Sequence, residues 1–322
     1  MQTSQTKTIA LDIDDMLTSM DIPMPKGQEE LDPVHHRPEA FLTVKFVHGD
    51  REYEVDNVLV PGCLEFFCFL FGQETVRPAF FSAGIRQRNL ALGRMIVESA
   101  IEFGQGDPSW RERYEVYSRE DCFDTERLGR LFDDEIARKF QPPGYFGNYK
   151  KDLRVIHYGR ERYRQLFWDT LEDPEVLMPD PDKDAPMLET VLMVEEDPSY
   201  LFPGQEKNFL LCPMYRHPEG GLKNYDRMDM PPIDPDDWRC DFKNTNTLFY
   251  AAGVLHHALD RHRREGIPLP EAVWQAQGKL WIDRECRDER FPLHFFEEGR
   301  TVLRRYNPNL NFAVSAANPQ KK

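Results

Sequence analysis

Two aspartates near the start of the chain have the spacing of a pair that acts together. Asp12 and Asp14 follow residues 8–11, an apolar run with the length and composition of a buried strand. Charge at the carboxyl end of such a strand lies where open α/β sheets bind their ligands. Close carboxylates repel each other unless a cation such as Mg²⁺ lies between them. For an isolated D-x-D pair, an acidic turn without function is the better interpretation.

A second acidic cluster supplies the distant partner that the first one needs. Residues 190–194 form the clearest buried strand of the sequence, and they lead into Glu195, Glu196 and Asp197. Three carboxylates at one strand end are costly to bury without a counter-ion. Together with the first pair, they predict a site for Mg²⁺ at the carboxyl ends of two strands.

Two further residues have the chemistry to bind an oxyanion. Ser82 follows a strand predicted at residues 78–81 and begins a turn of small residues, which offers a hydroxyl and backbone N–H groups. The same serine is equally suited to cap a helix predicted at residues 86–99, and the two roles are compatible. Lys151, in the segment YKKDL, carries a positive charge. Taken alone, a lysine is most often an ordinary surface charge.

The elements between these residues predict an α/β fold. Residues 41–60 form two alternating runs about a Gly-containing turn, which indicates a β-hairpin inserted close to the site. Residues 157–187 are rich in acid and proline and are expected to be a loop insertion, and residues 213–241 are loop-like as well. The other expected elements are a buried helix at 63–71, a short strand at 114–117, helices within 125–139, a run at 209–212 that leaves the core, and helices at 245–264, 270–287 and 291–305.

Composition limits the classes of partner. The chain has 322 residues, of which 40% are hydrophobic, enough for a sizeable core. The formal net charge of -15 argues against nucleic acid or an anionic membrane as the main partner. Six cysteines without C-x-x-C spacing suit a reducing compartment. With neither a signal peptide nor an apolar run of membrane length, we expect a soluble protein, cytoplasmic or delivered into a host cytoplasm without a classical signal peptide.

Four motifs now stand in order: LDIDDMLT at 11–18, FFSAG at 80–84, YKKDL at 149–153 and VLMVEEDPSY at 191–200. In this order, and with a hairpin between the first and second, the chain resembles the haloacid dehalogenase (HAD) superfamily. More narrowly it resembles the FCP/SCP (NLI-interacting-factor-like) phosphoprotein phosphatases, and it is also similar to bacterial effector-type HAD phosphotyrosine phosphatases. The resemblance implies a doubly wound parallel sheet with the hairpin insertion, and we expect an added C-terminal helical segment that the resemblance does not cover.

The resemblance also divides the chain. It implies a HAD-like phosphatase domain at 7–264 and does not reach the residues beyond it. From their own composition we expect residues 265–305 to form a helical extension that packs on the core, and residues 306–322 to be a flexible tail. The extension is rich in large apolar side chains, which are costly to leave in water.

The resemblance assigns a role to each candidate residue. Asp12 would be the nucleophile that forms an aspartyl-phosphate, and Asp14 the acid and base. Ser82 and Lys151 would hold the phosphoryl oxygens. Mg²⁺ would be bound by Asp12, Glu196 and the backbone carbonyl of Asp14, with Glu195 shaping its outer coordination shell. The expected activity is a Mg²⁺-dependent phosphatase, and the expected partner is a phosphorylated protein.

Two departures from the family pattern leave alternatives open. Met16 stands where the family usually has threonine, and Glu195-Glu196 stand where it has Asp-Asp or Asp-Asn. A pseudophosphatase that binds phosphoprotein without turnover is therefore one alternative. A small-molecule HAD phosphatase is another, although such enzymes usually cover the site with a cap domain. The sequence does not distinguish phosphotyrosine from phosphoserine or phosphothreonine substrates.

Overall fold

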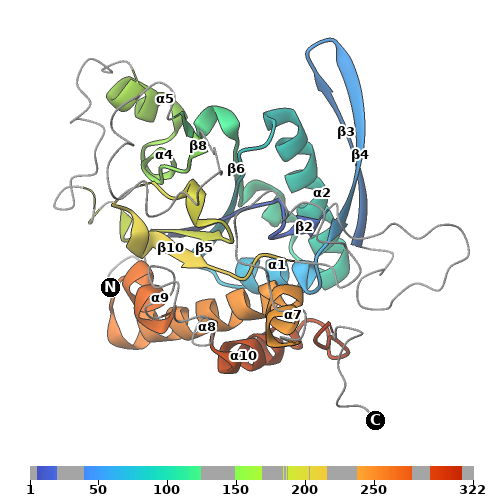
Figure 1. Cartoon of the computed structure of the whole chain (residues 1–322), viewed down its shortest axis with the longest axis vertical. Coiled ribbons are helices and arrows are strands. Elements are labelled where there is room, and N and C mark those ends of the chain that lie inside the picture. Colours follow the sequence, from blue (N-terminus) through green and yellow to red (C-terminus); the bar gives the residue numbers. More distant parts are fainter. Residues whose placement is uncertain are drawn as a thin grey trace, which may run out of the picture.

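A computed structural model describes residues 6–19, 40–124, 149–168, 184, 186, 188–202, 204–215, 238–277 and 291–313. The fold is α/β, with a five-stranded parallel sheet flanked by helices (Figure 1). The strands are β1 (Lys7–Leu11), β5 (Val76–Phe81), β6 (Glu115–Tyr117), β9 (Val191–Glu195) and β10 (Phe209–Leu211), in the spatial order β10-β9-β1-β5-β6.

The central position of β1 determines where a ligand can enter. From β1 the chain continues outward through β5 to β6 and later returns on the other side of β1 with β9 and β10. The strand order therefore reverses between β1 and β9, and a crevice opens at the carboxyl ends of strands at such a switch point. The two acidic clusters follow these two strands.

Alternation along the strands gives the sheet two buried faces. Ile9, Leu11, Phe80 and Val194 point to one face, which is covered by five helices. These are α1 (Cys63–Phe71), α2 (Arg86–Gly104), α8 (Thr247–Glu265), α9 (Leu269–Gln277) and α10 (Leu293–Leu303).

The opposite face of the sheet belongs to a separate cluster. It includes Ala10, Phe81 and Met193 and packs against α4 (Arg154–Tyr158), α5 (Arg160–Tyr163) and the π-helical turn Arg164–Trp168. Residues 154–158 and 160–168 are therefore helical, which corrects the start of the loop insertion expected from residue 157. Most of the rest of that insertion, at 169–183, lies outside the described residues.

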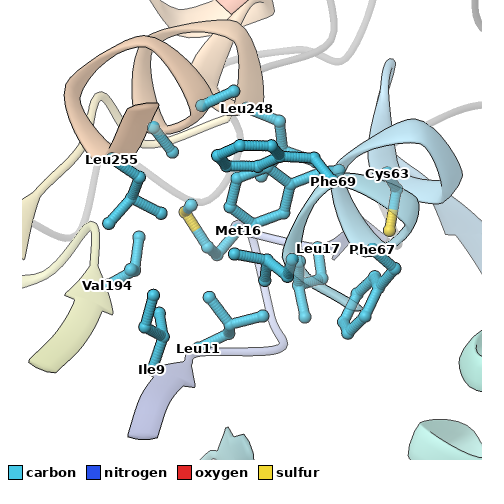
Figure 2. Close-up of a cluster of buried hydrophobic side chains, with 14 of the residues drawn as sticks. Ile9, Leu11, Met16, Leu17, Cys63, Phe67, Phe69, Val194, Leu248 and Leu255 are labelled. Carbon is cyan, nitrogen blue, oxygen red and sulfur yellow. The ribbon is translucent and has the colours of Figure 1, made fainter. Parts of the chain in front are cut away.

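Met16 belongs to the apolar core. Its side chain is fully buried among Phe69, Leu248 and Leu255 in the cluster that Figure 2 shows. The residue that stands where the resemblance would have threonine thus faces helices α1 and α8. The departure at Met16 is explained by packing, and it leaves the carboxylates of Asp12 and Asp14 untouched.

A hairpin stands beside the main sheet. It consists of β3 (Phe41–His48) and β4 (Arg51–Leu59), and β4 also pairs with the short strand β2 (Thr18–Ser19) that follows the first acidic pair. Figure 1 shows the hairpin as a long arm that projects from the body. The hairpin expected at residues 41–60 is present, and β2 connects its base to the loop that carries Asp14.

The remaining elements are short. A two-stranded pair joins β7 (Phe123–Asp124) to β8 (Tyr149–Lys150), immediately before Lys151. The described residues also include one further helix, α7 (Trp238–Thr245). Short 3-10 turns occur at Pro108–Glu112, Arg119–Asp121, Pro198–Tyr200 and Glu206–Asn208. Residues 238–241, expected to be loop, are therefore helical, and residues 216–237 lie outside the described part of the chain. Among the described residues, no helix is long and apolar enough to cross a membrane.

Two further expectations are corrected. Residues 209–211 do not leave the core but form β10, a buried edge strand of the sheet. Residues 307–313, expected to be flexible, pack against the helices, with Leu310 and Ala313 buried and both backbone groups of Ala313 bonded to the Asn246 side chain. Residues 314–322, the helices expected within 125–139 and the helical stretch expected at 278–287 lie outside the described part of the chain.

Helices α8 and α10 touch backbone to backbone. A Cβ atom placed on Gly253 would lie 1.9 Å from the carbonyl oxygen of Phe295, and one placed on Gly299 would lie 1.7 Å from that of Phe249. Real Cβ atoms do not approach this closely, so only glycine permits the crossing. Figure 1 shows both helices on the same side of the sheet.

We expect Gly299→Ala to destabilise the protein by more than about 2 kcal/mol, although alanine is the better helix former by about 1 kcal/mol. The new methyl group meets backbone atoms that cannot rotate away, so the helices must separate. Thermal or urea unfolding would measure the change. Thr301→Ala, two positions along the same helix and exposed, is the control and should change stability by no more than about 0.5 kcal/mol. Equal stability of Gly299→Ala and wild type would contradict this account of the crossing.

Candidate active site at the carboxyl edge of the sheet

Asp12 is the first residue after β1 and lies at the centre of the site. Its backbone N–H donates to the carbonyl of Val194, 3.0 Å away, so the residue is fixed against β9 before the chain turns. Its side chain is buried, and its Oδ1 accepts a hydrogen bond from Lys151 Nζ. The carboxylate is therefore held rigidly at the switch point of the sheet.

Lys151 joins the two acidic clusters. Its fully buried Nζ contacts Asp12 Oδ1 and lies 2.5 Å from Glu195 Oε2. The backbone N–H of Lys151 donates to the carbonyl of Tyr200, 2.7 Å away, and the Tyr200 ring lies 4.7 Å from Nζ. The lysine expected to bind phosphate is thus fixed at both ends of its side chain.

A buried hydrogen-bond network around Asp152 holds the segment that carries Lys151. The carboxylate of Asp152 accepts hydrogen bonds from Arg154 Nε at 3.0 Å and from Tyr163 Oη and Gln205 Nε2, each at 2.7 Å. All four side chains are buried. A buried polar network whose members are hydrogen-bonded is rigid, because the loss of any one partner is strongly destabilising. The network therefore fixes the backbone beside Lys151.

The two glutamates at the end of β9 have different environments: Glu195 is its last residue and Glu196 follows it. Glu195 is fully engaged: Oε2 contacts Lys151, and Oε1 accepts from the N–H groups of Glu196 and Asp197 at 3.1 and 3.2 Å. Glu196 Oε2, in contrast, is buried and has no hydrogen-bond partner among the described residues. An unpartnered buried carboxylate oxygen is costly unless a cation binds it. Asp197 lies apart and caps the next turn by accepting from Ser199 N at 2.8 Å.

Asp12, Glu195 and Glu196 each offer one carboxylate oxygen, and these three oxygens lie within 4.8 Å of one another. Burial raises the pKa of Asp12 well above its usual value, against the attraction of Lys151. Burial, followed by repulsion from Glu195 and Asp12, likewise raises the pKa of Glu196. For Lys151, burial lowers the pKa, but attraction to Asp12 and Glu195 outweighs it and the pKa is raised. One ammonium thus faces three acids, and such a cluster of oxygen ligands could hold a metal ion.

Asp14 belongs to a second group. Its side chain is 42% exposed, and its two oxygens accept from the guanidinium of Arg88, with NH1 2.9 Å from Oδ2 and NH2 in contact with Oδ1. Ser82 Oγ donates to the same Oδ2 at 3.3 Å. The Asp14 carboxylate is therefore outside the cluster of three acids, whereas the resemblance assigned only its backbone carbonyl to the metal.

Ser82 does not cap the helix that follows it. The N-cap position of α2 is Ile85, and no side chain caps that end. Ser82 Oγ instead accepts from Gly84 N at 3.0 Å, and Asn89 holds the turn by donating to the carbonyls of Ser82 and Gly84 at 3.4 and 3.3 Å. The serine hydroxyl is thereby kept at the carboxyl end of β5, facing Asp14.

Arg88 and Asn89 were not found from the sequence, although one signal pointed to Arg88. Arginines in the first turn of a helix are unfavourable, because the helix dipole places positive potential there. Arg86 and Arg88 both lie in the first turn of α2. The sequence therefore places positive charge at a helix end where it lowers the stability of the helix. The structure brings Asp12, Lys151, Glu195 and Glu196 into one cluster, and Asp14, Ser82 and Arg88 into another.

Comparison with known proteins does not identify this site. No protein-family model matches the chain, and no curated protein matches it. The function must therefore be inferred from the side chains that the fold brings together.

Proposed function

We propose that this protein is a Mg²⁺-dependent phosphoprotein phosphatase that acts through an aspartyl-phosphate on Asp12. The observation that carries the proposal is the meeting of Asp12, Lys151 and Glu196 at one switch point, although they are far apart in sequence. A carboxylate next to a buried lysine and a cation site has the parts that phosphoryl transfer requires, because that reaction depends chiefly on positioning and on neutralising charge.

The cation site fits the chemistry of Mg²⁺. Asp12 and Glu196 offer carboxylate oxygens, and Glu196 Oε2 has no other partner among the described residues. When bound, Mg²⁺ would neutralise charge on the phosphoryl oxygens and on the nucleophile. Glu195 is held by Lys151 and by two backbone N–H groups. It would orient the residues that bind the metal and would itself stay outside the inner coordination shell.

The remaining side chains divide the reaction between them. Asp12 attacks phosphorus, the bond from phosphorus to the leaving oxygen breaks, and that oxygen takes a proton from Asp14. Water then attacks the phosphorus, gives its proton to Asp14 and breaks the bond to Asp12, which releases inorganic phosphate. Lys151 and Ser82 hold the phosphoryl oxygens through both steps.

The arrangement of the motifs supports the HAD resemblance. The first motif follows the central strand β1, the second follows β5, and the acidic motif follows β9 on the other side. A hairpin lies between the first two motifs, and its described part is an arm rather than a domain above the site (Figure 1). This favours a protein substrate over a small molecule, because the described part of this insertion forms no cap domain.

One observation favours the pseudophosphatase alternative. Arg88 occupies both oxygens of Asp14, the residue that must exchange protons with the substrate. If that ion pair were permanent, the chain would bind phosphoprotein without turning it over. Measured turnover decides between the two, and the substitution that separates them is that of Asp12.

We expect the purified protein to hydrolyse p-nitrophenyl phosphate only when Mg²⁺ is present. EDTA should reduce the rate by at least about a hundredfold, and excess Mg²⁺ should restore it, because three acids and one lysine leave the site too negative for an anionic substrate. Release of p-nitrophenolate measures the rate. Unchanged turnover in EDTA would exclude a metal-dependent mechanism.

The class of phosphorylated residue is to be tested directly. One peptide sequence carrying phosphotyrosine, phosphoserine or phosphothreonine at the same position would be compared by phosphate release, with Mg²⁺ at a fixed concentration. A ratio of kcat/KM above about tenfold for one residue, equal to about 1.4 kcal/mol, would assign the specificity.

A further inference from the structure

Arg88 has a position that its ion pair with Asp14 does not fully explain. Its side chain is about nine-tenths buried and reaches the mouth of the site from the first turn of α2. Besides Asp14, its NH2 lies 3.3 Å from Asn57 Oδ1 on β4, and its NH1 lies 3.4 Å from Asn89 Oδ1. Two amide oxygens thus hold the guanidinium in place from elements other than the Asp14 loop.

The donors of Arg88 and Ser82 converge on one point. Asp14 Oδ2 accepts from Arg88 NH1 at 2.9 Å and from Ser82 Oγ at 3.3 Å. An oxygen of any other anion placed at that point would meet the same two donors. Ser82 is also the residue that the proposed function assigns to a phosphoryl oxygen. The Asp14 carboxylate therefore occupies a ready-made position for an oxyanion.

Asp14 is the group that can leave. Its side chain is 42% exposed, whereas that of Arg88 is 11% exposed. A carboxylate whose two oxygens both accept from one guanidinium cannot also reach a leaving-group oxygen, so catalysis requires the pair to open. A buried guanidinium without an anion is costly, so Arg88 needs a replacement partner when that happens.

We propose that Arg88 exchanges the Asp14 carboxylate for the phosphoryl oxygens of the bound substrate, and is thus a substrate-binding residue of this site. The inference rests on the proposed function, which supplies phosphate as the ligand. The planar fork of arginine suits two phosphoryl oxygens as well as it suits a carboxylate. Arrival of the phosphoryl group would at the same time free Asp14 to face the leaving group.

The rival account is that Arg88 only positions Asp14. Both accounts predict that Arg88→Gln impairs activity, so this single substitution does not separate them. They differ once Asp14 is removed. If Arg88 only positions Asp14, then Arg88 has no task left in an Asp14→Ala protein. If Arg88 binds phosphate, it is still needed there.

The test is the affinity for inorganic phosphate, measured by isothermal titration calorimetry with Mg²⁺ present, in Asp14→Ala and in Asp14→Ala/Arg88→Gln. We expect the double variant to bind at least about tenfold more weakly, as for the loss of a charged hydrogen bond. Arg94→Gln in the Asp14→Ala background, an exposed change on the same helix, should leave the affinity unchanged. Equal affinities with and without Arg88 would overturn the inference, as would failure of Asp14→Ala to bind phosphate.

Two additions keep the result clear. If Arg88→Gln melts at a lower temperature than wild type, Asp14→Ala/Arg88→Lys replaces it. We expect an intermediate loss of affinity from lysine, which keeps the charge but not the fork. Because the measurement needs no turnover, the two proposals fail separately. If the wild type shows no turnover but its phosphate binding depends on Arg88, the proposed phosphatase function is refuted and the proposed role of Arg88 stands. If the wild type shows turnover but phosphate binding does not depend on Arg88, the phosphatase function stands and the role of Arg88 is refuted.

Discussion

Asp12→Asn should abolish turnover of every phosphomonoester and leave the fold intact. The amide keeps the volume of the buried side chain but has no negative charge with which to attack phosphorus. Loss of a catalytic nucleophile costs three orders of magnitude or more, roughly, in other hydrolases. Phosphate release from p-nitrophenyl phosphate and from phosphopeptides would measure the loss.

The same substitution makes a second, independent prediction about stability. Without metal, Asp12, Glu195 and Glu196 share one lysine, and burial raises the pKa of Asp12 and of Glu196. Removing one carboxylate relieves this repulsion, so the metal-free variant should melt at the same temperature as wild type or higher. Mg²⁺ should raise the melting temperature of wild type by a few degrees, on the order expected for a bound ligand, and that of the variant by less.

Asp15→Asn is the matched control. It makes the same chemical change three positions along the loop, and Asp15 has φ of 56°, a conformation that asparagine adopts readily. The control should retain turnover and the stabilisation by Mg²⁺. Should wild type and Asp12→Asn instead give the same background rate on all substrates, while both bind phosphopeptide, the chain is a pseudophosphatase.

The sequence predicted the acidic clusters because their signal is local. A short apolar run followed by carboxylates describes both β1 with Asp12 and β9 with Glu195 and Glu196, and parallel strands bring their carboxyl ends together. The hairpin and α8 were predicted for a similar reason, since alternation and helical periodicity repeat within a few residues. The sequence could therefore predict the carboxylates at the ends of β1 and β9, and from these the position of the site.

Features that depend on distant contacts were missed. β10 has only three residues, and the side chain of Gln277 completes its edge, accepting from Leu211 N at 3.1 Å and donating to Phe209 O at 2.6 Å. No pattern within 209–212 reveals a partner so far along the chain. Arg88 was missed for the same reason, because its partners Asn57 and Asp14 come from other elements.

Cutting the chain after Arg264 should produce a protein that aggregates or is strongly destabilised. The cut removes α9 and α10, whose buried side chains lie in the same hydrophobic cluster as those of β1, α1 and α8. The large apolar residues that we expect to pack there differ in burial. Phe295, Phe296, Val302 and Leu303 are buried, Trp274 and Phe291 are half-buried, Leu293 is 46% exposed, and Leu280 and Trp281 lie outside the described residues.

Burying a large apolar side chain contributes about 1.5–3 kcal/mol, so the four buried residues of α10 alone account for roughly 10 kcal/mol before entropy, comparable with the net stability of a domain. The cut also removes Gln277 from the edge of β10, leaving backbone groups of that buried strand without their partner. It therefore damages the sheet as well as the helical layer.

A chain that ends at Ala313 retains every contact described here and is the control for the cut at Arg264. Size-exclusion chromatography and thermal unfolding would compare the two with the full chain. The rival view is that residues 265–313 form an independent docking module whose apolar face waits for a partner. That view requires the shorter protein to stay monomeric, to melt as the full chain does and to keep its activity. The backbone contact of Gly253 with Phe295 and Gly299 argues against it, because helices that dock reversibly have no need of a crossing that only glycine permits.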